Sequence, residues 1–142
     1  MTPDQAEPTL GLYVHWPFCL AKCPYCDFNS HVGEVIDHDR WAAALIGELD
    51  HFAAQTGPRR LVSIFFGGGT PSLMRPATVA ALIDRAALAW RAEAAIESTL
   101  EANPTAGEAD RMAELAAACG TRVAAGVPAA SERRAGCLAP VP

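Results

Sequence analysis

Three cysteines lie close together near the N-terminus of this 142-residue chain. Cys19, Cys23 and Cys26 have the spacing C-x3-C-x2-C and follow a short apolar run at residues 12–14. Thiolates separated by two or three residues can point into one metal centre without stretching the backbone. Structural zinc sites and ordinary 4Fe-4S clusters usually have four protein ligands. Three thiolates therefore predict a centre with one open position, which a substrate or cofactor can occupy.

Two other interpretations use the same cysteines. His15 or His31 could complete a structural zinc site, or two of the thiols could form a disulfide and leave the third free. Neither alternative accounts for the glycine and glutamate motifs that follow along the chain. The first ten residues have no signal-peptide pattern, so we expect a cytoplasmic protein, in which thiols stay reduced and clustered cysteines more often bind metal.

Composition argues against a nucleic-acid partner and against a membrane-spanning protein. The formal net charge of -5 leaves no basic footprint, so nucleic acid is not an expected partner. No apolar run approaches the roughly 18 residues of a membrane-spanning helix, so the sequence does not indicate a membrane protein.

Three strand and helix pairs are expected to position the chemistry. The expected strands are residues 12–14, 61–66 and 95–100; the expected helices are residues 37–55, with Asp37 as N-cap, residues 76–90, and one that follows a capping box at Thr105 and Glu108. The expected buried faces are Trp41, Leu45, Leu49 and Phe52 in the first helix, Val79, Leu82, Ile83, Ala86 and Trp90 in the second, and Met112, Leu115, Ala116 and Cys119 in the third. This alternation predicts an α/β fold with parallel strands.

Chemistry in such folds gathers at the carboxyl ends of the strands. Gly67, Gly68, Gly69 and Thr70 follow the second strand, and a run of glycines lets the backbone approach a ligand closely. This run is neither a dinucleotide fingerprint nor a phosphate loop, and alone it is as often a plain turn. Glu101 follows the third strand, where a carboxylate can meet a cationic amino group, although alone it is as often a solvated residue. Cysteines, glycines and carboxylate together predict one site.

The same motifs resemble those of the radical S-adenosylmethionine superfamily. Y-V-H-W-P-F-C before the cysteines and C-P-Y-C-D-F-N-S-H through them are similar to the oxygen-independent coproporphyrinogen oxidase group, particularly its HemW-type haem chaperones. Oxidases of this group carry a further cysteine where this chain has Phe28. That difference favours the chaperone branch.

The resemblance implies both fold and site. Residues 11–127 would form the N-terminal part of a radical SAM partial (β/α)6 barrel, truncated after about three βα units. Cys19, Cys23 and Cys26 would ligate three irons of a 4Fe-4S cluster; Tyr13 and Tyr25 would pack beside cluster and cofactor; Gly68, Gly69 and Thr70 would hold S-adenosylmethionine, and Glu101 would meet its amino group. In the superfamily the reduced cluster splits this cofactor into methionine and a 5′-deoxyadenosyl radical, so no side chain is assigned as catalytic. The further partners implied are haem or a porphyrin and a haem-accepting protein.

The resemblance weakens after about Ala118. The family's fourth strand has a glutamine after Gly-Val, where this chain has Pro128. We expect residues 1–10 to be a disordered arm and residues 128–142 a disordered tail with a free thiol at Cys137. A frameshift near Cys119, giving a truncated and impaired product, would explain that tail. The functional alternatives are a coproporphyrinogen III oxidase that decarboxylates propionate side chains, a haem carrier whose cluster serves structure or regulation, and a non-functional fragment of either.

Overall fold

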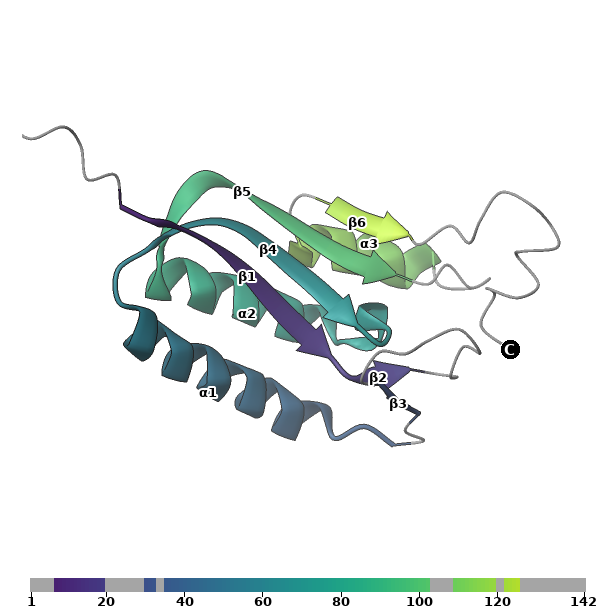
Figure 1. The fold of residues 1–142 in the computed structure, drawn as a ribbon. Helices are drawn as coiled ribbons and strands as arrows, with labels where there is room; N and C mark the ends of the chain where they lie inside the picture. The colour runs from purple at the N-terminus through teal and green to yellow at the C-terminus, as the bar shows by residue number, and fades with distance from the viewer. Residues whose placement is uncertain (1–6, 20–29, 33–34, 103–108, 120–121, 126–142) are drawn as a thin grey trace, which may run out of the picture.

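A parallel sheet forms the centre of the computed structural model, which describes residues 7–19, 30–32, 35–102, 109–119 and 122–125 (Figure 1). Its four strands are β1 (Thr9–Trp16), β4 (Arg60–Gly68), β5 (Arg91–Ala102) and β6 (Arg122–Ala125), in the order β1-β4-β5-β6. All neighbouring pairs are parallel. Two further strands, β2 (Phe18–Cys19) and β3 (His31–Val32), pair with each other separately. The predicted parallel α/β fold is thus confirmed.

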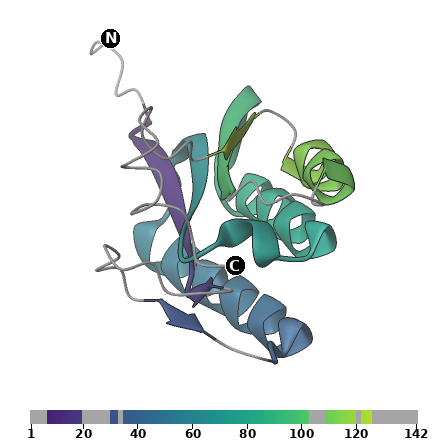
Figure 2. The same cartoon turned by 90° about the vertical axis from the view of Figure 1, so that its right-hand side faces the viewer.

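The three α-helices of the described residues lie on one side of this sheet (Figure 2). They are α1 (His38–Thr56), α2 (Pro76–Ala89) and α3 (Ala109–Cys119), and a single turn of 3-10 helix, η1 (Pro71–Leu73), follows β4. The main strands are ordered in space as they are in sequence, without the reversal that marks a doubly wound sheet. This arrangement is that of an arc of a β/α barrel, in which each helix covers the outside of the strands that flank it.

Alternation along the strands separates the two faces of the sheet. The helix-covered face carries the buried core, which includes Val14, Trp16, Leu61, Ile64, Phe66 and Leu100 from the strands and Leu49, Val79, Leu82, Ala86 and Leu115 from the helices. On the opposite face Tyr13 is 55% exposed and Phe65 is 37% exposed. The continuous apolar run at residues 61–66 is therefore buried on its helix-covered face, whereas Phe65 on the other face is partly exposed.

The first helix begins and ends where its capping residues predict. The Asp37 side chain accepts a hydrogen bond from the Arg40 backbone amide at 3.0 Å, as an N-cap does. Gly57 follows the helix with a φ of 63°, which glycine adopts without strain. Trp90 caps the second helix rather than continuing it, and is buried as expected.

Some boundaries and faces differ from the sequence-based expectation. Strand β1 begins at Thr9, inside the expected N-terminal arm, because Thr9 and Leu10 pair with Arg60 and Leu61 of β4. Phe52 of α1 is 49% exposed, whereas its neighbour Ala53 packs on the core.

In α3, Ala116 is exposed and Ala118 packs on the core instead. In both helices the stripe that packs on the core is shifted around the helix relative to the expected pattern, so one expected residue lies outside it and a neighbouring alanine lies inside it. The expected capping box at Thr105 and Glu108 lies outside the described residues. Within the described part of the chain, no helix combines the length and the apolar character that crossing a membrane requires.

Candidate functional site

The first predicted metal ligand, Cys19, lies at the end of β2 and is only 8% exposed. Strand β2 pairs with β3, and the His31 backbone amide donates to the Pro17 carbonyl oxygen at 2.6 Å. This pairing brings together the two ends of the segment that contains the other predicted ligands. Cys23 and Cys26, together with Tyr25 and Phe28, lie outside the described residues. In the ranges that the structure does describe, no three His, Cys, Asp or Glu side chains gather as a metal site.

The glycine turn, which comprises residues 67–70 at the carboxyl end of β4, lies directly against Cys19. A Cβ atom placed on Gly69 would lie 2.8 Å from the Cys19 Sγ and 2.6 Å from the Phe18 carbonyl oxygen. The Gly69 amide donates to the Trp16 carbonyl oxygen at 2.6 Å, and the Thr70 amide donates to the Phe18 carbonyl oxygen at 2.8 Å. Only glycine at position 69 lets the turn approach the thiol so closely. The turn thus fits a centre built on this cysteine.

Gly67 and Gly68 also lie too close to neighbouring atoms to carry a side chain. Gly68 has a φ of 110°, and a Cβ there would lie 2.6 Å from the Trp16 carbonyl oxygen and 2.9 Å from the His15 ring. A Cβ on Gly67 would lie 2.9 Å from the rings of both Tyr13 and Phe65. The sequence predicts that Gly68, Gly69 and Thr70 act together with Cys19, and the structure brings these four residues to one edge of the sheet.

Tyr13 lies on the open face of the sheet near this edge. Its hydroxyl and the His15 Nδ1 are 3.2 Å apart, within hydrogen-bonding distance. Its ring stacks on Phe65, with 6.0 Å between ring centroids and an interplanar angle of 17°. Burial, and secondarily the negative charge of Glu101, raise the pKa of Tyr13, so its phenol stays neutral at physiological pH.

Glu101 is the third predicted component and lies near the carboxyl end of β5. Its side chain is exposed to solvent, yet the surrounding strands displace enough water to raise the pKa of the carboxyl group. The register pairs Tyr13 with Phe65 and Phe65 with Thr99, and Glu101 lies two residues after Thr99, so Glu101 faces the same side of the sheet as Tyr13. A cation bound beside Glu101 would counteract the desolvation and favour the ionised carboxylate.

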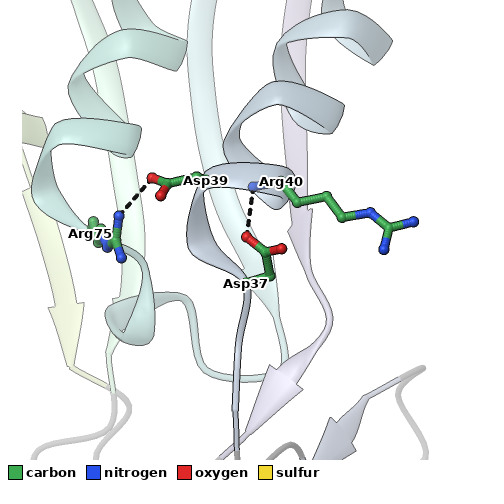
Figure 3. A network of polar contacts seen from close by, with 4 residues as sticks. All are labelled: Asp37, Asp39, Arg40 and Arg75. Carbon is green, nitrogen blue, oxygen red and sulfur yellow. Dashed lines mark hydrogen bonds and ion pairs between the residues drawn. The ribbon is translucent and has the colours of Figure 1, made fainter.

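Polar contacts lie at the N-terminal ends of α1 and α2 (Figure 3). Arg75, between η1 and α2, forms an ion pair with Asp39 of α1 at 2.8 Å. Because both side chains are well exposed, such a pair contributes about 0–1 kcal/mol. Arg40 points away from this pair, and only its backbone amide joins the network, through Asp37.

Sequence reasoning missed Phe65 and Arg111 in this region and considered His15 only as a possible zinc ligand. His15 lies two residues after Tyr13 on β1, and Phe65 pairs with Tyr13 from β4, so both lie on the same face as Tyr13 and Glu101. The two-residue spacing and the expected strand pairing are the signals that could have indicated them. Arg111 donates to backbone carbonyls of η1 from nearly forty residues away, and no local pattern indicates that contact.

Comparisons with known proteins identify a family and several relatives of this chain. The family model of the Radical SAM superfamily matches residues 13–141. The heme chaperone HemW of Escherichia coli K12 is 45% identical over 131 residues, which cover 89% of this chain and 34% of that protein. The mitochondrial radical S-adenosyl methionine domain-containing protein 1 of Bos taurus is 40% identical over 126 residues, which cover 89% of this chain and 28% of that protein.

A solved structure shares the fold. Coproporphyrinogen III oxidase (HemN) from Escherichia coli, described as a radical SAM enzyme, superposes with a TM-score of 0.76 and 30% sequence identity, over 89% of this chain and 30% of that one. The chain thus spans roughly a third of the length of these relatives. The parallel arc of β/α units is the radical SAM fold, and the family match extends over most of the sequence. The chain therefore belongs to the radical SAM superfamily.

Proposed function

We propose that Cys19, Cys23 and Cys26 hold a 4Fe-4S cluster and that the adjoining glycine turn holds S-adenosylmethionine. The observation that carries this proposal is the contact between Cys19 and Gly69, where a single added methyl group would collide with the thiol. A turn that is held this close to one cluster ligand can present a small molecule to the iron that the three cysteines leave open.

The remaining groups suit the amino-acid end of that cofactor. Backbone carbonyls of a glycine turn can accept hydrogen bonds from an ammonium group, and the Glu101 carboxylate can pair with its charge. The raised pKa of Glu101 marks a carboxylate with reduced solvation, which gains from a bound cation. Tyr13 and Tyr25 would shield this end from water. When bound, the cluster would supply one electron for reductive cleavage of the sulfonium.

In a protein of the relatives' length, we propose haem-chaperone function of the HemW type. Support comes from the 45% identity to a protein named heme chaperone HemW and from Phe28, which stands where oxidases of the group carry a further cysteine. Haem and a haem-accepting protein would then be the partners, and we propose the cytoplasm as the compartment. The alternative is oxidative decarboxylation of coproporphyrinogen III, which the fold of HemN favours.

Metal analysis tests the cluster. The chain is reconstituted anaerobically with iron and sulfide beside two variants, one with Cys19, Cys23 and Cys26 all changed to alanine and one with the core residue Cys119→Ala as control. About four irons and four sulfides per chain are expected in the wild type and in the control, and none in the triple variant. Bound zinc in place of iron, or equal iron in the triple variant, would reject the cluster.

Haem binding and porphyrinogen turnover separate the two whole-protein functions. The homologous full-length protein is titrated with haem and, in parallel, incubated anaerobically with coproporphyrinogen III and S-adenosylmethionine. Stable haem binding without decarboxylation supports the chaperone. Release of carbon dioxide with product formation would replace the chaperone proposal by the oxidase.

A further inference from the structure

Arg111 reaches from α3 to the turn that follows the glycine run. Its Nε donates to the Ser72 carbonyl oxygen at 2.7 Å. Its Nη2 donates to the carbonyl oxygens of Leu73 at 2.7 Å and Met74 at 3.1 Å. One guanidinium therefore satisfies three consecutive backbone acceptors at the end of η1.

Water has little access to the three carbonyl oxygens that Arg111 contacts. Ser72 is 1% exposed and Met74 is fully buried, so water has little access to this turn. The last carbonyls of any helical turn point beyond its end and find no partner within it. A buried carbonyl without a partner is destabilising, so the turn depends on a donor from elsewhere in the fold.

The position of Arg111 in its own helix is unfavourable. It lies in the first turn of α3, where the positive end of the helix dipole disfavours a cation. Burial lowers the pKa of His38, and the positive charges of Arg75 and Arg111 lower it further. A cation held at the positive end of a helix needs a compensating contact, and the three carbonyls provide it.

The other end of the same segment is held by backbone. Gly69 and Thr70 donate to carbonyl oxygens of Trp16 and Phe18, on the strands that lead into the cysteine loop. Within the turn, the amides of Leu73 and Met74 donate to the carbonyl oxygens of Thr70 and Pro71. Residues 69–74 are thus fixed to the cysteine strand at one end and to α3 at the other, and Arg111 is the side chain that makes the second connection.

We propose that Arg111 is a positioning residue for the cofactor site. By holding the carbonyl end of η1, it sets the conformation of the glycine turn and so the affinity for the methionine end of S-adenosylmethionine. This inference rests on the proposed function of that turn. It extends the site to α3 and assigns a role to a side chain that acts on the cofactor through the backbone of the turn.

The test compares Arg111→Met and Arg111→Lys with the wild type. Methionine keeps the aliphatic stem and removes all donors, whereas lysine keeps the charge and can reach one or two of the carbonyls. Arg85→Met is the matched control, since it removes an arginine from an exposed ion pair with Asp50 on the helix layer. Each reconstituted protein is titrated with S-adenosylmethionine, and iron content is measured alongside.

Arg111→Met is expected to weaken S-adenosylmethionine binding about tenfold or more, with iron content unchanged, and Arg111→Lys is expected to recover part of the loss. Arg85→Met should bind as the wild type does. An affinity for Arg111→Met within about twofold of the wild type, at equal iron content, would overturn the inference and leave the proposed function standing. A wild type that holds the cluster and does not bind S-adenosylmethionine would overturn both.

A second readout needs no cofactor. Hydrogen exchange of the Leu73 and Met74 amides in the metal-free chain reports on the turn directly. These amides should exchange about tenfold faster in Arg111→Met and at the wild-type rate in Arg85→Met. Unchanged exchange in Arg111→Met would show that the turn holds its conformation without the guanidinium, which also overturns the inference. If Arg111→Met fails to fold, both readouts apply to Arg111→Lys, with smaller expected changes in the same direction.

Discussion

Replacing Gly69 by alanine tests the close approach on which the candidate site rests. An added Cβ would lie 2.6 Å from the Phe18 carbonyl oxygen, 2.8 Å from the Cys19 Sγ and 2.9 Å from the Phe18 carbonyl carbon. Two of these atoms belong to the Phe18 backbone, and the third ends the short, buried side chain of Cys19. Relief therefore requires the glycine turn and β2 to separate, which breaks the hydrogen bonds from Gly69 and Thr70.

The size of the effect follows from the geometry. Forcing one extra carbon into a packed site typically costs about 1–3 kcal/mol. In urea this corresponds to a midpoint lowered by about 1 M for a small protein. Because the displaced atom is the predicted cluster ligand itself, the reconstituted variant should also hold less iron than the wild type.

Gly47 provides the matched control. It lies within α1, and an added Cβ there would have no atom within 4 Å. Gly47→Ala should therefore raise the free energy of unfolding by about 0.5–1 kcal/mol through helix propensity, with iron content unchanged. Urea denaturation followed by circular dichroism measures both variants. A Gly69→Ala chain with the midpoint and the iron content of the wild type would refute the geometric reasoning.

Three further variants test other parts of the structure. Glu101→Gln should bind S-adenosylmethionine more weakly and yet, without cofactor, be slightly more stable than the wild type at pH 7, because the raised pKa of Glu101 means that folding penalises the ionised carboxylate. The gain in melting temperature should vanish as the pH falls below the ordinary pKa range of a glutamate, where the wild-type side chain is also neutral. A difference in melting temperature that stays constant at all pH values would contradict this reasoning. Thr56→Val should cost about 1–3 kcal/mol because the indole N–H of buried Trp90 loses its 2.9 Å acceptor, and a double-mutant cycle with Trp90→Phe should show the coupling. Asp37→Ala should lower the free energy of unfolding by about 0.5–2 kcal/mol through loss of the N-cap bond to the Arg40 amide, and no change in urea midpoint would argue against that bond.

Local patterns determined the elements of this protein. Asp37 and Gly57 mark the ends of α1 because a capping side chain and a left-handed backbone act on groups only a few residues away. The apolar run at residues 61–66 predicted a parallel strand, and the positions of the cysteines, the glycine run and Glu101 predicted a site at successive strand ends. The family match covers residues 13–141 and therefore includes all of these motifs. Such features depend on backbone geometry and side-chain type, which the sequence carries directly.

Contacts between distant segments were decided only by the tertiary structure. The two-residue pairing of β2 with β3, the collision that a side chain at Gly69 would make with Cys19, and the three hydrogen bonds from Arg111 all join residues that lie far apart along the chain. The same is true of exposure, since Phe52 and Phe65 belong to apolar patterns and still face outward. A pattern specifies which face of an element is apolar, but the packing of neighbouring elements decides how much of that face is covered, and this depends on the whole fold rather than on any local stretch.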